Sequence, residues 1–114
     1  MTEAAIDHVN EVRLVGRVSD EPIERVMPSG DVLVTWTLVV NRLGSGAGRL
    51  TVDSLECATF LSRVRRTVMR WAPGDVVEIE GAVHRRFFRS TGGPRVSRYQ
   101  IEVFGARRLD RAPR

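Results

Sequence analysis

Residues 61–83, with the sequence LSRVRRTVMRWAPGDVVEIEGAV, decide the fold, because the spacing of their apolar residues changes from a helical period to a strand period. In the first half, apolar residues stand three or four positions apart, as on one face of a helix: Leu61, Val64, Val68 and Trp71. We expect Ser62 to cap the start of this helix and Pro73-Gly74 to end it. In the second half, apolar and polar residues alternate from Val77 to Val83, which predicts a strand that continues to Phe88.

Three strands are predicted before the helix. Alternation over residues 12–18 predicts the first, and Ile23–Val26 is expected to continue it after a turn. Residues 32–40 form the most β-rich stretch of the chain, and residues 50–60 predict the third strand. The glycine-rich residues 44–48 suit a flexible connection, and they lack the Gly-Lys-Ser/Thr sequence of a phosphate-binding loop.

Two strands are predicted after the helix, joined by a hairpin turn at residues 90–94. The first is expected to direct alternate residues toward the core: Val77, Ile79, Gly81 and Val83. The second covers residues 96–104 and has Tyr99, Ile101 and Val103 on one face. From Gly105 onward we expect a short, basic and loose tail.

Three strands, one helix and two strands is the element order of the OB-fold, an all-β, five-stranded Greek-key barrel with one helix between strands 3 and 4. Gly16 and Gly81 suit such a barrel, because strongly curved strands need glycine at bends. A different small barrel or sandwich is the alternative. The 114 residues fit one domain, placed at residues 10–104 between an N-terminal arm, residues 1–9, and the tail, residues 105–114.

The charge of the chain is concentrated at one end. All 18 basic residues are arginine. Residues 1–83 hold 9 arginines against 12 acidic residues, a net −3, and residues 84–114 hold 9 against 2, a net +7, which together give the overall +4. This asymmetry favours a polyanionic partner such as nucleic acid, and planar guanidinium groups bind phosphate and stack on bases. A solvated basic surface is the alternative reading.

Several functional classes are disfavoured by composition. No apolar run approaches the roughly 18 residues of a membrane span, and residues 1–10 lack the apolar core of a secretory signal. The single cysteine, Cys57, cannot form an internal disulfide and is expected to be a small buried residue. We therefore expect a cytoplasmic, nucleoid-associated protein with no membrane partner. Two histidines and one cysteine give no metal-ligand spacing, and no nucleophile motif is present, so we expect no cofactor, no metal and no enzymatic activity.

Three stretches together resemble one family. They are Asn10–Val18 with the nearby Glu21-Pro22 and Met27–Gly30, then Val77–Arg86, and finally Arg98–Val103. In this order, and spaced around one helix over residues 10–104, they resemble the bacterial single-stranded DNA-binding proteins. The resemblance implies an OB-fold that forms tetramers and wraps single-stranded DNA through basic grooves and stacking aromatic rings, in replication, repair or recombination.

The resemblance also implies which residues bind DNA. It places a stacking aromatic ring at Phe88, which shares a strand face with His84 and Arg86; the alternatives are that Phe88 closes the barrel or lies in a subunit contact and that Arg86 forms an ordinary ion pair. Arg85 is among the arginines expected to strengthen binding. The full candidate set for nucleic-acid binding is Arg13, Arg17, Arg42, Arg49, Leu55, Phe60, His84, Arg86, Phe88, Arg89, Arg95 and Arg98.

The chain departs from the family pattern where aromatic and basic residues are usual. Leu55 stands where the family has a stacking tryptophan, and Leu43 where a loop aromatic is usual. Glu56 and Cys57 follow Leu55, and Ala72-Pro73 replaces basic residues. Losing two stacked rings weakens binding by about 2–6 kcal/mol if nothing compensates. Residues 109–114 are basic rather than an acidic-hydrophobic tip, so no recruitment of repair enzymes through such a tip is expected and an accessory member of the family is indicated.

Two other functions remain open. The barrel could serve as an oligomeric scaffold that has lost tight strand binding, although a scaffold has little reason to hold +7 in its last 31 residues. Alternatively, it could bind duplex DNA or structured RNA through shape and phosphates. In each case we expect a homo-oligomer, a tetramer before a dimer.

Overall fold

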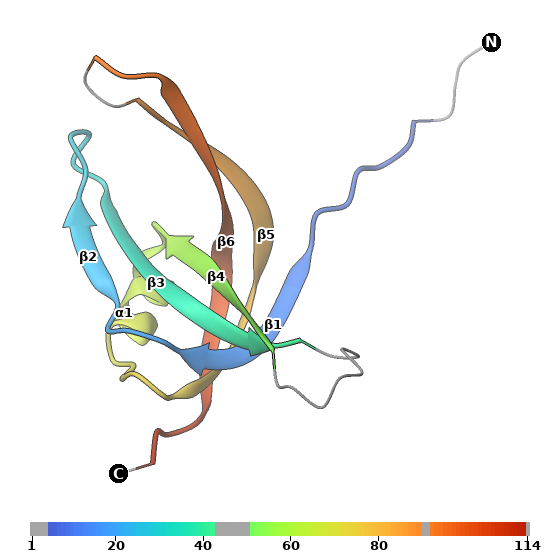
Figure 1. Cartoon of the computed structure of the whole chain (residues 1–114), viewed down its shortest axis with the longest axis vertical. Helices are drawn as coiled ribbons and strands as arrows, with labels where there is room; N and C mark the ends of the chain where they lie inside the picture. The colour runs from blue at the N-terminus through green and yellow to red at the C-terminus, as the bar shows by residue number, and fades with distance from the viewer. Residues whose placement is uncertain (1–4, 43–50, 90–91, 114) are drawn as a thin grey trace.

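The computed structural model describes residues 5–42, 51–89 and 92–113, with only the backbone of Phe88 and Arg89. Within these residues, six strands and one helix follow one another (Figure 1). Their bounds are β1 Val12–Val18, β2 Ile23–Val26, β3 Val32–Asn41, β4 Val52–Thr59, α1 Ser62–Val68, β5 Val76–Arg89 and β6 Arg95–Asp110.

The strands close into the expected barrel. Their order is β1-β5-β6-β4-β3-β2, and β1 also pairs with β3, which closes the sheet into a barrel. The β4–β6 pairing, Cys57 opposite Ile101, is parallel, and the other pairings are antiparallel. β1 and β2 together take the place of the first predicted strand, since both pair with β3. The predicted OB-fold, with one short helix before the last two strands, is confirmed.

The barrel interior is filled by the residues that alternation predicts. Leu38, Val77 and Ile79 are fully buried, as is Cys57, where burial raises the pKa of the thiol to about 12. Trp36 packs edge-on against Trp71, with ring centroids 5.9 Å apart and an interplanar angle of 86°. Both tryptophans are buried, so they belong to the core and not to a binding surface.

Glycine is required where the barrel strands approach most closely. A Cβ atom at Gly81 would lie 1.9 Å from the carbonyl oxygen of Glu102, and one at Gly16 would lie 2.4 Å from that of Val39. Neither contact is possible, so both positions require glycine because the neighbouring backbone leaves no room for a side chain. At Gly81 the register between β5 and β6 also shifts by one residue, since Glu80 faces Gly105 and Gly81 faces Val103.

The helix begins differently from the prediction. Ser62 is the first helical residue rather than the N-cap, and Leu61 stands at the N-cap with no side-chain hydrogen bond. The backbone N–H of Leu61 donates a hydrogen bond of 3.2 Å to Oγ1 of the buried Thr59, the last residue of β4. Leu61 is 47 % exposed, so the buried stripe contains only Val64, Val68 and Trp71. The helix ends at Val68 and not at Pro73-Gly74.

The predicted end of the last strand is also wrong. β6 does not stop at Phe104 but continues to Asp110, and the segment expected to be loose pairs with β5. The buried carboxylate of Asp75 helps to hold this C-terminal segment in place. It accepts hydrogen bonds from the backbone N–H groups of Ala72 (2.9 Å) and Ala112 (2.7 Å), and Arg108 lies 3.7 Å away.

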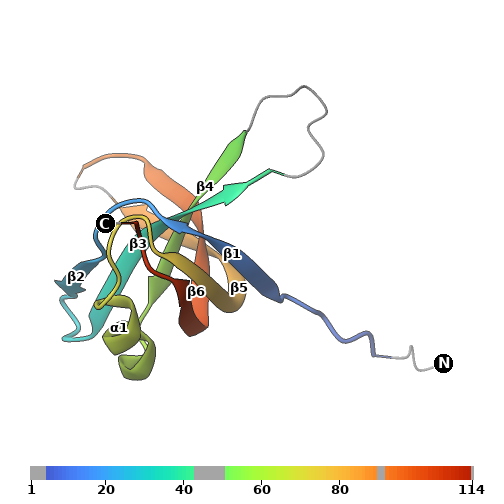
Figure 2. The same cartoon turned by 90° about the horizontal axis from the view of Figure 1, so that it is seen from below.

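Beyond the barrel, β5 and β6 continue as a two-stranded ribbon (Figure 1). β1 pairs with β5 only as far as Gly81, and the side chain of Asn10 then hydrogen bonds with both the N–H and the C=O of Val83. Residues 5–9 are exposed and lead away from the barrel (Figure 2). We call residues 82–89 and 95–100 the β5–β6 hairpin; the turn predicted at residues 90–94 joins its strands, with residues 90–91 outside the described part.

Candidate nucleic-acid interface

The β5–β6 hairpin presents two different faces, because side chains alternate along each strand. The Gln100 face consists of His84, Arg86, Arg98 and Gln100 and continues onto Glu56 and Phe60 at β4. The Tyr99 face consists of Val83, Arg85, Phe87, Arg95, Ser97 and Tyr99. Both faces are rich in arginine, but their remaining side chains differ.

On the Gln100 face, the arginines belong to a network that contains a carboxylate. The amide of the buried Gln100 donates to Glu56 and accepts a hydrogen bond of 3.3 Å from Nη1 of Arg86. The guanidinium carbon of Arg86 lies 5.7 Å from the centroid of the Phe60 ring, and Arg98 lies 3.7 Å from Glu56. The positive charge of this face is therefore partly offset by Glu56.

On the Tyr99 face, arginines alternate with exposed rings. Phe87 is 53 % exposed and Tyr99 is 67 % exposed. The guanidinium carbon of Arg85 lies 5.0 Å from the centroid of Phe87 and 5.7 Å from that of Tyr99. Arg95 approaches the Phe87 ring to 4.7 Å, and Arg85 donates two hydrogen bonds to Oγ of Ser97, at 3.1 and 3.0 Å. This arrangement places cations and π-faces side by side on a surface open to solvent.

Five of the predicted binding residues are brought together at the hairpin. His84, Arg86 and Arg98 lie on the Gln100 face, where Phe60 joins them, and Arg95 lies on the Tyr99 face. His84, Arg86 and Phe60 also line a small pocket together with Ala58, Gln100 and Glu102.

Three predicted residues cannot be placed by their side chains. Phe88 and Arg89 are the last residues of β5, where they pair with Val96 and Arg95, but their side chains lie outside the described part of the structure. Arg49 lies outside the described residues altogether, as does Leu43. Their proposed contacts with DNA stay predictions.

Four predicted residues lie away from the hairpin. Arg13 and Arg17 are on the outer side of β1, and Arg13 forms an ion pair with Glu78. Arg107 binds the same carboxylate, with its Nε 2.9 Å from Oε1 of Glu78. Arg107 lowers the pKa of Glu78, and Arg13 lowers it further. Burial raises it, but the pKa remains below its ordinary value.

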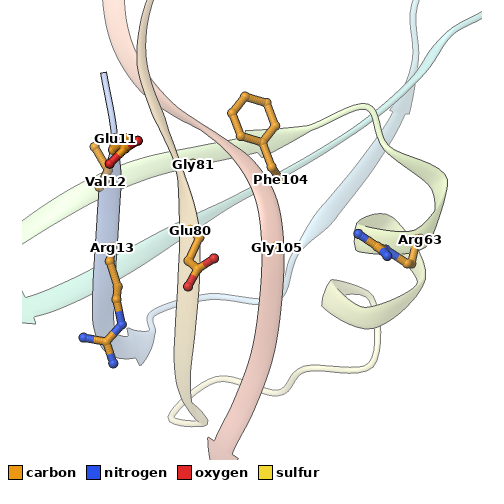
Figure 3. Close-up of a pocket in the computed structure, with 8 residues that line it drawn as sticks. All are labelled: Glu11, Val12, Arg13, Arg63, Glu80, Gly81, Phe104 and Gly105. Carbon is orange, nitrogen blue, oxygen red and sulfur yellow. The ribbon is translucent and has the colours of Figure 1, made fainter. Parts of the chain in front are cut away.

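The surroundings of Arg13 are mixed in charge. Figure 3 shows Arg13 and Arg63 around an open pocket that also contains the carboxylates of Glu11 and Glu80 and the ring of Phe104. Two carboxylates at the same pocket disfavour phosphate. This pocket is therefore less suited to a polyanion than the hairpin is.

Leu55 and Arg42 are the other two predicted binding residues that lie away from the hairpin. Leu55 pairs with the fully buried Leu38 across β3 and β4, so it points into the barrel and not toward Phe60. Arg42 forms an exposed ion pair with Asp53 at 2.6 Å. That hydrogen bond lowers the pKa of Asp53 and raises that of Arg42.

Two aromatic residues were missed by the sequence reasoning, Phe87 and Tyr99. Val83 was expected to face the core but is 41 % exposed, and Tyr99, which was expected only to share a face with Ile101 and Val103, is more exposed still. Alternation predicts correctly that Tyr99 shares a face with Ile101, but this face is covered only inside the barrel. The signal that could have revealed this exposure is the length of β5 and β6. Both strands are longer than β1, so part of their core-facing side cannot be covered by it.

Among the described residues, no three His, Cys, Asp or Glu side chains are grouped to hold a metal ion. The one helix described here, α1, is far too short to cross a membrane.

Known proteins resemble this chain in sequence and in fold. Single-stranded DNA-binding protein 3 of Listeria innocua is 30 % identical over 96 residues, which is 83 % of this chain and 59 % of that protein. Single-stranded DNA-binding protein B of Bacillus subtilis is 26 % identical over 106 residues, 92 % of this chain and 94 % of that protein. A solved structure described as the Plasmodium falciparum SSB complex with ssDNA has the same fold, with a TM-score of 0.77, 19 % identity, and coverage of 94 % and 100 % of the two chains.

The family assignment rests on the extent of the match. Against several relatives, such as those of Listeria innocua and of Staphylococcus aureus, the chain spans only 59 % and 53 % of the relative's length. The profile of the Single-strand binding protein family, however, matches residues 9–109, nearly the whole chain. The chain therefore belongs to the single-strand binding protein family.

Proposed function

We propose that this protein binds single-stranded DNA without strong sequence preference, by means of the β5–β6 hairpin. The observation that supports this most directly is the gathering of arginines and exposed aromatic rings on that hairpin. The relatives are named as single-stranded DNA-binding proteins, and the Plasmodium falciparum neighbour is described in complex with ssDNA. The proposed activity is binding and not catalysis.

The physical basis is the same for any base sequence. A single strand is held by cations along its backbone and by aromatic rings on which bases stack. Every base has a π-face, so stacking on Phe87, Tyr99 or Phe60 does not depend on which base is present. The arginines Arg85 and Arg95 supply the charge that the phosphates require.

The test is fluorescence anisotropy of a labelled oligo-dT titrated with the protein, with duplex DNA of equal length as competitor. We expect saturable binding to oligo-dT that duplex DNA does not displace. Displacement by an equal amount of duplex would overturn the preference for single strands. Absence of binding by a folded protein at micromolar concentration would overturn the function and favour a scaffold.

We also propose a homo-oligomer, a tetramer before a dimer, that acts in replication, repair or recombination in the cytoplasm, at the nucleoid. Within the described residues, β1 pairs with β5 only up to Gly81, and β4 pairs with β6 only from Ile101 onward. The outer edges of the hairpin strands are therefore unpaired there, and unpaired strand edges favour association. Light scattering coupled to size-exclusion chromatography tests the assembly. A mass of one chain at micromolar concentration would contradict it.

A further inference from the structure

We infer that the single strand runs over the Tyr99 face of the hairpin, with bases stacked on Phe87 and Tyr99 and phosphates bound by Arg85 and Arg95. This inference rests on the proposed function and assigns its main contact surface. It differs from the expectation based on the family resemblance, which places the strand over the face of His84 and Arg86.

Charge distinguishes the two faces. The Gln100 face holds the carboxylate of Glu56 within the network of Gln100 and Arg98, and Glu102 lies at the same pocket as Arg86. A phosphate approaching this face meets negative charge close by. The hairpin residues that alternate on the Tyr99 face include no Asp or Glu, and none of the ion pairs found in the described residues involves Arg85 or Arg95. Phosphate is therefore repelled less on the Tyr99 face.

The Tyr99 face is also organised before any ligand arrives. The two hydrogen bonds from Arg85 to Ser97 hold the guanidinium group between the Phe87 and Tyr99 rings. Arg95 lies on the Phe87 ring, so the contacts run from Arg95 through Phe87 and Arg85 to Tyr99. The guanidinium groups proposed to bind phosphate are therefore gathered beside both rings, and a base that stacks on Phe87 takes the place of one of them on the ring.

The spacing of the two rings suits an unpaired strand. Phe87 faces Ser97, so Phe87 and Tyr99 are diagonal neighbours across the hairpin. Such neighbours stand about 7–8 Å apart, whereas successive bases in one strand of a duplex rise by about 3.4 Å. Two neighbouring bases can therefore reach both rings only if they are unstacked from each other. A single strand can do this, and a duplex cannot without being disrupted.

The test compares variants of the two faces in the oligo-dT titration. Phe87→Ala and Tyr99→Ala should each weaken binding by about 5- to 150-fold, the range measured for loss of one stacked base. Tyr99→Phe is the matched control, since it keeps the ring, and should bind within about twofold of wild type. Phe60→Ala and Arg86→Ala, on the Gln100 face, should have the smaller effects. Both rings of the Tyr99 face are exposed, so thermal melting of these variants should match wild type.

Cross-linking provides a second measurement that does not depend on variants. Oligo-dT containing 4-thiothymidine is irradiated with the wild-type protein, and the linked peptides are identified by mass spectrometry. We expect links to Phe87 or Tyr99. Links confined to Phe60 and His84, or unchanged affinity in the Phe87→Ala/Tyr99→Ala double variant, would overturn the inference while leaving the proposed function intact. If the wild-type protein does not bind oligo-dT, the proposed function fails and this inference fails with it.

Discussion

Gly81 lies at the point where the barrel ends and the hairpin begins. A Cβ atom there would overlap the carbonyl oxygen of Glu102, on the neighbouring strand. The strands could relieve that overlap only by separating, and their separation would disturb both the buried Ile79 and the hairpin beyond it. The side chain missing at one residue thus allows the two strands to stay paired through the bend.

Replacing Gly81 with alanine should therefore lower the free energy of unfolding by about 1–3 kcal/mol, as other overpacked sites do. Gly105→Ala is the matched control in the neighbouring strand, because a Cβ atom there meets nothing closer than 3.9 Å. Urea denaturation of the two variants measures the difference. Equal stability of both variants would contradict the steric explanation.

At single residues, sequence alternation predicts which side a residue takes but not whether that side is covered. It correctly directs Val77 and Ile79 of β5 into the buried core. It fails for Val83 in the same strand, because the coverage of that face depends on where β1 stops pairing. That point is determined by contacts between strands distant in the sequence, which periodicity does not report.

The end of β6 shows how one buried carboxylate orders a whole segment. Asp75 follows the turn after α1 and binds Ala112, 37 residues further along the chain. Burial of Asp75 opposes its ionisation, but the N–H groups of Ala72 and Ala112 and the charge of Arg108 together hold its pKa below the ordinary value. Because the pKa is lower in the folded state, the ionised carboxylate stabilises the fold above about pH 4.

Asp75→Asn should accordingly reduce the free energy of unfolding by about 1–3 kcal/mol at pH 7, since one backbone N–H then faces an amide donor instead of an acceptor. In the wild type, stability should fall as the pH drops below about 4, and this dependence should be weaker in Asp75→Asn. Denaturant unfolding between pH 3 and 7 measures both effects. Asp20→Asn, which changes an exposed carboxylate, should behave like wild type.

If Asp75→Asn had the same stability and pH dependence as wild type, the proposed ordering by Asp75 would be wrong. The C-terminal extension of β6 could not be predicted because it depends on pairing with β5 and on the contact of Ala112 with the distant Asp75, and neither leaves a pattern in the sequence. The start of α1 was misjudged for a similar reason. Ser62 has the residue type of an N-cap, but the backbone N–H group of Leu61 is bound by Thr59 of the preceding strand.

In the molecule as a whole, the apolar core lies in the barrel, and the excess of arginine lies in the C-terminal part that includes the hairpin. The barrel buries the apolar faces of β1, β3, β4 and β5. The β5–β6 hairpin extends beyond the barrel (Figure 1), and its sequence is rich in arginine. The order of elements was predictable because each element has its own period and the helix interrupts the strands once. The proposed binding surface was predicted only in part, since Val83 was expected to face the core and the exposed Phe87 and Tyr99 were not among the predicted binding residues.

Binding through the hairpin should depend on salt. If Arg85 and Arg95 each neutralise one phosphate, the logarithm of the affinity should fall with the logarithm of salt concentration with a slope of about −1.4. Between 50 and 200 mM salt the affinity should thus decrease by about 7-fold. Anisotropy titrations at several salt concentrations measure the slope. A flat response would exclude arginine–phosphate contacts as the main source of affinity.

The most direct test of the central claim is hydrogen–deuterium exchange of the protein with and without oligo-dT. It reports both whether a single strand binds and where. Slower exchange concentrated in residues 82–89 and 95–100 is the result that binding through the β5–β6 hairpin predicts. Unchanged exchange throughout the chain at saturating oligo-dT, or protection confined to β1 around Arg13 and Arg17, would contradict it.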